Sequence, residues 1–354
     1  MLRTLYLSNC KKLHSLLLEL PQSIIYLCLT GSDIEYLPAS IKQLAKLNAI
    51  CLNNCKKLHS LPVELPHSIT DLDLSASNIE FLPASIKQLT MLERLHLYNC
   101  RKLHSLPPEL PQSITELHLG GSNIEHLPES FKQLTRLSYL SLSDCKMLRS
   151  LPELPSLRRI LLIKNTSLVT TKFVTPWTAL RNLTMKFVDC VKLGEHAQSS
   201  NLENAYSSVN QTQYGKSIRG ISFFKMRMPG SRGPELFNDD NRSKEDSITI
   251  QIDPSSKIMA CLFFVVLCPF SFNPEENGFY IKCYGVSTYW EQAWGYIDLN
   301  NDHIHFWALD TFVDTPWTSP NSSFKFVVES QEGKPLPNVR IKECGILPIY
   351  TFEG

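Results

Sequence analysis

Several features that mark common protein classes are missing from this chain of 354 residues. Basic and acidic residues nearly cancel, with 35 Lys and Arg against 34 Asp and Glu, and the formal net charge is +1. A chain without a charge excess has no electrostatic footprint for nucleic acid or for an anionic membrane surface. We therefore expect neither nucleic acid nor membrane as a partner.

Long apolar runs are missing too. The longest one, residues 258–268, is too short to cross a bilayer as a helix and is followed by Pro269, so we expect a buried strand there. Met1 is followed at once by the repeat sequence, so we expect no secretory signal.

Motifs for enzymatic chemistry are also missing. No Gly-x4-Gly-Lys-(Ser/Thr) phosphate loop and no Gly-x-Ser-x-Gly nucleophile motif occur in the sequence. His303 and His305 share one face of a predicted strand beside Asp302, but no third metal ligand has a plausible spacing, and packing beside Trp307 is preferred. We expect no enzyme activity, no metal site and no cofactor.

What the sequence does contain is a repeat with a period of 45 residues, built from two alternating texts. One reads LxxLxLxNCKKLHSLP and the other SIxxLxLxxSxIExLPxSIKQL, so each period holds two coils of about 22 residues. This period and the LxxLxL core are typical of a leucine-rich repeat, in which each coil adds one short strand to a solenoid. The first text carries Cys10, Cys55, Cys100 and Cys145 in one slot, and the second begins at Ser23, Ser68 and Ser113.

Eight clear strands follow from this pattern, and Met185 with Phe187 suggests a ninth. Behind the strands, Leu-Pro-x-Ser-(Ile/Phe)-Lys-Gln-Leu predicts a helix of one or two turns, whereas Leu-Pro-x-Glu-Leu-Pro favours extended chain because of its two prolines. The predicted strand triplets are Leu2/Leu5/Leu7, Ile24/Leu27/Leu29, Leu47/Ile50/Leu52, Ile69/Leu72/Leu74, Leu92/Leu95/Leu97, Ile114/Leu117/Leu119, Leu137/Leu140/Leu142 and Leu157/Ile160/Leu162.

The cysteines in the shared slot are expected to be buried, reduced thiols. Cys10 and Cys55 lie two coils apart, about 9–10 Å, which is too far for a disulfide. Ser32, Ser77 and Ser122 fill the same slot in the alternate coils, so a thiol or hydroxyl there is expected to bond to the backbone. Reduced thiols favour a cytoplasmic or nuclear location.

The residues between the leucines of each strand are the candidates for partner binding. Side chains alternate along a strand, so these positions point together to the concave face of a solenoid. Coils four to seven place charged and aromatic side chains there, and Tyr and Arg are common in binding hot spots. The candidate residues are Tyr26, Asp71, Asp73, Arg94, His96, Tyr98, Glu116, His118, Tyr139 and Arg159.

The repeat text ends near residue 193, so we expect a solenoid over 1–193. Residues 194–217 read as a polar connector, and residues 218–354 show short strand signals separated by Pro, Gly and Asn, as in an antiparallel sandwich. The expected fold is an α/β leucine-rich-repeat solenoid followed by an all-β antiparallel sandwich. An aromatic loop over 284–296 contains Trp290 and Trp294, which we take as further partner-binding candidates, although core packing is the stronger expectation for this loop.

Several motifs of the second half carry a resemblance to a known family. They resemble the domain that follows the repeats in plant disease resistance proteins of the TIR-NBS-LRR class, called the C-terminal jelly-roll and Ig-like domain. The NCKKL turns and GSxIExLPxSI coils of the repeat region are similar as well, so the resemblance covers nearly the whole chain. The motifs are Met228-Pro-Gly-Ser231, Ser247-Ile-Thr-Ile250, Leu262-Phe-Phe-Val-Val266, Asn301-Asp-His-Ile304, Phe324-Lys-Phe326, and Ile341-Lys-Glu-Cys-Gly345 with Tyr350.

This resemblance implies the sensing part of an intracellular immune receptor, in which repeats and sandwich together bind a pathogen effector protein. The family's TIR and nucleotide-binding (NB-ARC) domains have no counterpart in these residues. The repeat text begins at Met1 without a polar cap, so we expect a longer parent protein or a truncated gene. Residues 232–237 read RGPELF where the family usually has Ile-Pro-x-Trp-Phe, and the missing Trp leaves the packing of this loop open.

Two other functions stay open from the sequence. Five Asn-x-(Ser/Thr) sequons, at Asn165, Asn182, Asn210, Asn241 and Asn321, suggest a standalone or secreted leucine-rich-repeat inhibitor of a foreign enzyme. The pair Trp290 and Trp294 alone suggests a carbohydrate-binding accessory domain.

Overall fold

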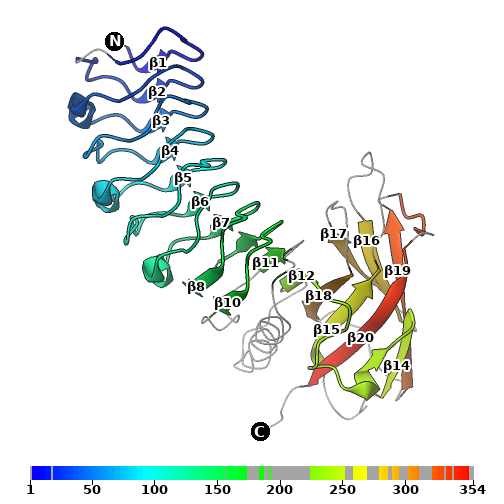
Figure 1. Cartoon of the computed structure of the whole chain (residues 1–354). Coiled ribbons are helices and arrows are strands. Elements are labelled where there is room, and N and C mark those ends of the chain that lie inside the picture. The colour runs from blue at the N-terminus through cyan, green and yellow to red at the C-terminus, as the bar shows by residue number, and fades with distance from the viewer. Residues whose placement is uncertain are drawn as a thin grey trace. The chain divides into compact units, whose positions relative to one another are not determined.

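The chain forms two compact units, Met1–Thr175 and Pro176–Gly354 (Figure 1). The computed structural model describes residues 2–16, 19–155, 157–173, 183–186, 190, 192, 224–251, 258–268, 279–285, 289–294, 302–310, 321–330, 332–336 and 339–350. The predicted connector over 194–217 lies outside these residues, so the predicted boundary stays a prediction. No helix within these ranges is both long and apolar enough to cross a bilayer.

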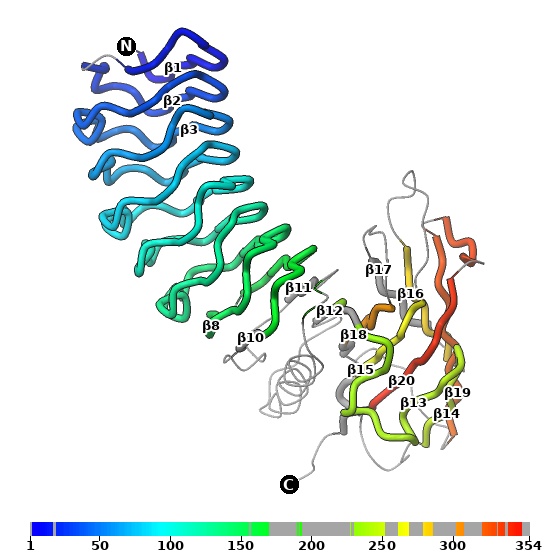
Figure 2. Tube along the Cα trace, viewed as in Figure 1, coloured from blue at the N-terminus to red at the C-terminus, as the bar shows by residue number. Residues whose placement is uncertain are grey.

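The first unit is a solenoid with a parallel sheet along one side, as the repeat predicts (Figure 2). All eight predicted triplets form strands, and each pairs in register with the next, for example Leu72 with Leu95 and Leu95 with Leu117. In sheet order the strands are β1 (Thr4–Tyr6), β2 (Tyr26–Cys28), β3 (Ala49–Cys51), β4 (Asp71–Asp73), β5 (Arg94–His96), β6 (Glu116–His118), β7 (Tyr139–Ser141) and β9 (Arg159–Leu161).

The prolines determine the conformation of the return segments. The predicted short helices are present as 3-10 helices, η1 (Ala39–Gln43), η2 (Ala84–Gln88) and η3 (Glu129–Gln133), each preceded by an extended proline. Each helix buries one apolar side chain, Ile86 in the case of η2. The Leu-Pro-x-Glu-Leu-Pro segments stay non-helical, and in the seventh coil the related sequence forms strand β8 (Ser150–Leu154), paired in parallel with β10 (Thr170–Phe173).

In each of the eight coils, a residue in the turn that follows the strand adopts a left-handed backbone conformation. Most of these residues are Gly, Asn or Asp, which tolerate positive φ best. Ala76 is the exception that has a Cβ and no polar side chain, with φ at 57°. The residues are Asn9, Gly31, Asn54, Ala76, Asn99, Gly121, Asp144 and Lys164.

The shared cysteine slot behaves as predicted in three coils. Cys55, Cys100 and Cys145 are fully buried, and each thiol donates a hydrogen bond to a backbone carbonyl of the preceding coil, as Cys55 does to Leu29 O at 3.1 Å. The Ser32 hydroxyl of that preceding coil lies 3.7 Å from the Cys55 sulfur. Burial raises the pKa of Cys100 to about 11. The prediction was wrong for Cys10, which is only half-buried because its strand, β1, lies at the edge of the described sheet.

The second unit contains two sheets made mostly of antiparallel strands. The first has the order β11 (Leu183–Lys186), β12 (Phe224–Pro229), β18 (His303–Asp310), β15 (Ile258–Leu267), β20 (Ile341–Tyr350) and β13 (Arg242–Ser243). The second has the order β14 (Ser247–Gln251), β19 (Asn321–Ser330), β16 (Phe279–Tyr284) and β17 (Tyr289–Trp294). The buried strand predicted over residues 258–268 is β15.

Apolar side chains from both sheets form one core. Phe263 stacks on Trp307 with ring centroids 5.4 Å apart, and Phe326 of the second sheet meets Trp307 edge-on at 6.3 Å. His303 and His305 of β18 are buried in this unit. Within the described ranges, no group of three or more His, Cys, Asp and Glu residues is arranged to hold a metal ion.

The aromatic segment over 284–296 differs from its prediction. The expectation of a loop was wrong for its middle part, because Tyr289–Trp294 forms β17 and pairs antiparallel with β16. Tyr and Trp are frequent in strands, so the composition of this segment is compatible with a strand although its residues show no clear alternation. The suggested ninth coil is β11, whose described pairing is with β12, and Phe187 lies outside the described residues.

The loop over 232–237 packs without the family's Trp. Phe237 is buried and lies edge-on to Phe264, with ring centroids 4.6 Å apart, and to Phe306 at 6.1 Å. A Cβ on Gly233 would collide with the Phe264 ring, so the absence of a side chain lets the loop lie flat on that ring. Arg242 ties the loop down by donating to the carbonyl oxygens of Gly233 and Pro234.

Candidate functional site

Each three-residue strand of the solenoid, such as Arg94–His96, points its middle residue into the core and its first and third residues to the opposite side. Leu72, Leu95 and Leu117 are fully buried, whereas their neighbours on the strands are partly exposed. We call this side of the sheet the open face. It carries a first row, Tyr26, Ala49, Asp71, Arg94, Glu116, Tyr139 and Arg159, and a second row, Cys28, Cys51, Asp73, His96, His118, Ser141 and Leu161.

Asp71 organises the charges at the centre of the open face. Arg94 Nε donates to Asp71 Oδ2 at 2.7 Å, and this hydrogen bond, together with the attraction between the two charges, raises the pKa of Arg94. His96 Nε2 lies 4.0 Å from the other carboxylate oxygen of Asp71. Asp73 is held by the backbone N–H of Ser75, which donates to its Oδ1 at 2.9 Å.

Four side chains form a continuous row of contacts across β5, β6, β7 and β9. His96 stacks on His118 with ring centroids 4.5 Å apart and planes 19° from parallel. His118 meets Tyr139 at 4.8 Å, and the guanidinium carbon of Arg159 lies 5.6 Å from the centre of the Tyr139 ring. We call these four residues the His–Tyr–Arg stack. A cation over an aromatic face at this distance is attractive, so this contact holds the Arg159 and Tyr139 side chains in place.

Burial sets the protonation of this stack. The pKa of His118 is lowered, first by burial and then by repulsion from His96, while Glu116 and Asp73 act in the opposite direction. His118 Nε2 is buried, makes no hydrogen bond in the structure and lies 3.9 Å from Glu116 Oε2. A neutral imidazole is therefore favoured at His118.

Tyr98 lies just beyond the end of β5 and is 49% exposed. Its ring lies over Gly120 of the next coil, where a Cβ would come 3.1 Å from the ring. The absence of a side chain at Gly120 therefore makes room for an aromatic side chain at the edge of the open face.

Within the solenoid, the structure brings the predicted binding residues together with one exception, Tyr26. Asp71, Arg94, His96, Glu116, His118, Tyr139 and Arg159 adjoin one another, with Asp73 and Tyr98 beside them. Tyr26 lies apart, because the small side chains of β3 separate it from Asp71. Its ring instead meets Tyr6 at 5.4 Å, and its hydroxyl lies 3.0 Å from the Cys51 sulfur. Trp290 and Trp294 lie on β17 of the other unit, and their side chains lie outside the described residues.

Sequence reasoning missed one constellation on the same face. Cys28 and Cys51 occupy the same position of consecutive triplets and are paired in register on β2 and β3. The signal was available, because the second row has Cys in two adjacent coils, but the four cysteines of the repeat slot dominate the cysteine pattern of the sequence.

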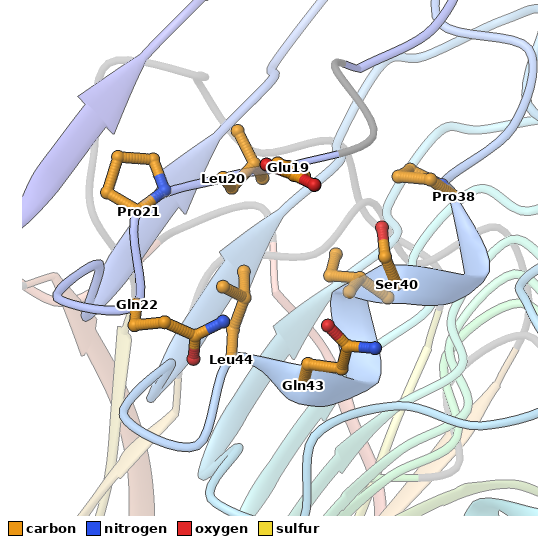
Figure 3. A pocket seen from close by; sticks show the side chains of 9 residues that line it. Glu19, Leu20, Pro21, Gln22, Pro38, Ser40, Gln43 and Leu44 are labelled. Carbon is orange, nitrogen blue, oxygen red and sulfur yellow. The ribbon is translucent and has the colours of Figure 1, made fainter.

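The return side of the solenoid has an open cavity of about 330 Å³ (Figure 3). Figure 3 shows Glu19, Leu20, Pro21 and Gln22 facing Ser40 and Gln43 of η1 and Leu44, which follows η1. In the next cycle His67 replaces Gln22, and its Nδ1 lies 3.1 Å from the carbonyl oxygen of Gln88. Among the described residues that line the cavity, Glu19 is the ionisable one.

Comparison with known proteins gives a fold likeness only. No protein-family model matches the chain, and no curated protein matches it. Among solved structures, the leucine-rich repeat domain of the type III effector XopL is similar, with 23% sequence identity and a TM-score of 0.38. The match covers 55% of this chain and 62% of that domain. The chain thus spans less than two thirds of the structure it matches.

Proposed function

We propose that the open face of the solenoid binds a protein partner, and that the chain is the recognition part of an intracellular plant immune receptor that detects a pathogen effector. Two independent lines support the proposal. The contact geometry of the open face supports protein binding, and the motif resemblance to TIR-NBS-LRR proteins supports the immune role and a jelly-roll and Ig-like second unit.

The observation that carries the proposal is the His–Tyr–Arg stack beside the Asp71–Arg94 ion pair. These side chains occupy neighbouring, in-register strands, so their positions are set by the backbone hydrogen bonds of the sheet. A rigid surface loses little conformational entropy on binding, and Tyr and Arg are the residues that most often dominate interface energies. The surface presents both charge signs and is suited to a polar protein surface of mixed charge.

Exposed ion pairs alone would not bind a protein partner tightly. The Arg94 side chain is 42% exposed, and pairs of this kind contribute about 0–1 kcal/mol. The aromatic and cationic side chains of and beside the open face, Tyr98, Tyr139 and Arg159, are therefore the ones expected to contribute most to binding. Asp71 and Arg94 would mainly set charge complementarity and orientation.

The proposal can be tested with single alanine substitutions of Tyr98, Tyr139 and Arg159 in the whole chain, screened for association with a panel of pathogen effectors in plant cells. For an effector that binds the parent chain, each substitution is expected to weaken binding roughly tenfold or more, since hot-spot truncations cost about 2 kcal/mol or more. Phe81→Ala and Lys87→Ala serve as controls, because both side chains are exposed but lie outside the open face.

Circular dichroism and thermal melting would show that the variants remain folded. Unchanged association of all three folded variants, or equal losses in the control variants, would remove the open face from the binding site. Binding that depends on the open face but involves a plant protein rather than an effector would keep the surface and reject the immune-sensing role.

The competing function, a secreted inhibitor, draws its support from the sequons. Asn165 is fully buried, and its Oδ1 accepts a hydrogen bond from the Cys145 backbone N–H at 2.9 Å, so this sequon cannot carry a glycan in the folded chain. Asn182 and Asn210 lie outside the described residues. Mass analysis of the protein from plant cells, with no glycan on Asn210 or Asn241, would remove the main support for this function.

A further inference from the structure

Two cysteines on the open face lie side by side at the ends of β2 and β3. Cys28 and Cys51 are paired in register and project to the same side of the sheet. Neighbouring strands are about 4.8 Å apart, which is within the Cα separation of roughly 4.4–6.8 Å that disulfides span. Both cysteines are free thiols in the structure.

Hydroxyl groups surround the two sulfur atoms. The Cys28 sulfur lies 3.2 Å from Ser8 Oγ and 3.3 Å from Thr30 Oγ1, and the Cys51 sulfur lies 3.0 Å from the Tyr26 hydroxyl. Burial by itself raises the pKa of Cys28, but its contacts with Ser8, Thr30 and Tyr26 outweigh burial, and the net pKa is lower than usual. Burial raises the pKa of Cys51.

This environment differs from that of the repeat-slot cysteines. Cys55, Cys100 and Cys145 lie in the core, donate to carbonyl oxygens and have raised pKa values, as expected of unreactive structural thiols. Cys28 instead lies within hydrogen-bond distance of the Ser8 hydroxyl, which can donate to a thiolate, while the Thr30 hydroxyl donates to Asn53 Oδ1. Beside it, Cys51 keeps its proton and is more exposed. A thiolate next to a second thiol is the arrangement that sustains reversible oxidation.

We propose that Cys28 and Cys51 form a redox-active dithiol, which a small hydroperoxide such as hydrogen peroxide oxidises to a disulfide. Cys28 is the reacting thiolate and Cys51 the resolving thiol. Cys28 is 7% exposed, so a small oxidant suits this site better than a bulky disulfide donor.

The reaction has two steps. In the first, the Cys28 thiolate attacks one peroxide oxygen, so that an S–O bond forms, the O–O bond breaks and hydroxide leaves, taking up a proton to become water. In the second, the Cys51 thiol loses its proton and its sulfur attacks the sulfur of the Cys28 sulfenic acid. The S–S bond forms, the S–O bond breaks, and a second water leaves. The two sulfurs together lose two electrons, and the peroxide gains them.

Oxidation would alter the open face locally. The disulfide uses the Cys51 sulfur that now meets the Tyr26 hydroxyl, so this hydroxyl would lose its partner beside the exposed Tyr6 ring. The covalent link would also join the second and third coils at their strands. Both effects are reversible by thiol reductants.

The test uses the purified, fully reduced whole chain treated with limiting hydrogen peroxide, followed by alkylation of the remaining thiols, digestion and mass spectrometry. A cross-linked Cys28–Cys51 peptide is expected, and it should form roughly tenfold faster in the folded chain than in urea, because the fold supplies both the thiolate and the proximity. Cys51→Ser is expected to accumulate a dimedone-reactive sulfenic acid at Cys28, whereas Cys28→Ser should give neither product.

Cys10→Ser is the matched control, because Cys10 is the half-buried thiol of the neighbouring coil, and the cross-link should form in this variant at the parent rate. The proposal is overturned if the folded parent chain forms no Cys28–Cys51 peptide, or forms it no faster than the unfolded chain. If Cys28→Ser fails to fold, the rates at which hydrogen peroxide consumes the free thiols of Cys28 and Cys10 in the parent chain decide, with faster loss expected at Cys28.

Discussion

At the scale of single residues, His118 shows how the open face balances burial against charge. Its ring lies between His96 and Tyr139, with Glu116 and Asp73 nearby, and burial is the main cause of its lowered pKa. Protonation would place a positive charge in a partly buried position within the stack. The neutral ring is thus part of the folded arrangement.

This balance predicts a pH dependence of stability. Because the pKa of His118 is lower in the folded chain than in the unfolded chain, where it is about 6.5, the unfolded state binds the proton first as the pH falls. Above a pH of about 6.5, the titration of His118 therefore leaves the free energy of unfolding unchanged. Below that pH it lowers the free energy of unfolding progressively, by at most about 1.4 kcal/mol per pH unit.

The measurement is urea unfolding followed by circular dichroism at pH 7.5, 6.5 and 5.5, in the parent chain and in His118→Gln. The parent chain should lose stability relative to this variant as the pH falls. His104→Gln, a substitution of an exposed histidine, should track the parent chain. A constant difference between the parent chain and His118→Gln across the three pH values would contradict the assignment.

At the scale of elements, periodicity predicted the strands, and the prolines predicted the conformation of the return segments. The eight solenoid strands and the 3-10 helices depend on the local amino-acid sequence, which is repeated often enough to be unambiguous. The second unit was harder to predict, because β17 is recognised only through its pairing with β16, and β13 is two residues long.

Among the site residues, the positions in the two rows of the open face were predictable from the alternation of side chains along each strand. Their mutual contacts were not, because ring stacking and the reach of Arg159 depend on side-chain rotamers that the sequence does not specify.

The loop over 232–237 provides the prediction at this scale. Gly233→Ala places a methyl group against the Phe264 ring and is expected to destabilise the second unit by about 1–3 kcal/mol, the usual cost of overpacking. Adding Phe264→Leu removes the ring atoms that clash, so the double variant should lose less stability than the sum of the two single variants.

Tryptophan fluorescence during urea unfolding is a suitable readout, because all five tryptophans lie in the second unit. Ser231→Ala in the same loop is the control and should leave the transition unchanged, since this side chain is exposed. Additive losses in the double variant would show that the Phe264 ring does not set the limit at Gly233.

At the scale of the whole solenoid, each coil is stabilised chiefly by its two neighbours. Leu95 on the central β5 is fully buried between β4 and β6, whereas Leu5 on the edge strand β1 is only half-buried. The same substitution should therefore have different consequences at the two positions, although the repeat text around them is nearly identical.

Leu95→Ala is expected to cost about 2–5 kcal/mol, as for other buried leucines, and Leu5→Ala clearly less. Hydrogen exchange measured by mass spectrometry should show lost protection in β4, β5 and β6 for Leu95→Ala, and a change confined to the first coils for Leu5→Ala. Equal losses at the two positions would mean that the array unfolds as one unit rather than through neighbour contacts.

The pairing of Ser32 with Cys55, Ser77 with Cys100 and Ser122 with Cys145 joins each serine coil to the cysteine coil after it. A gene that gained or lost a 45-residue segment by unequal recombination would keep every such pair intact. A gain of a single coil would instead set serine against serine or thiol against thiol at the new junction. Viable length variants of this array are therefore expected to differ by whole cycles, which lets the number of strands on the open face change while the joints between coils stay the same.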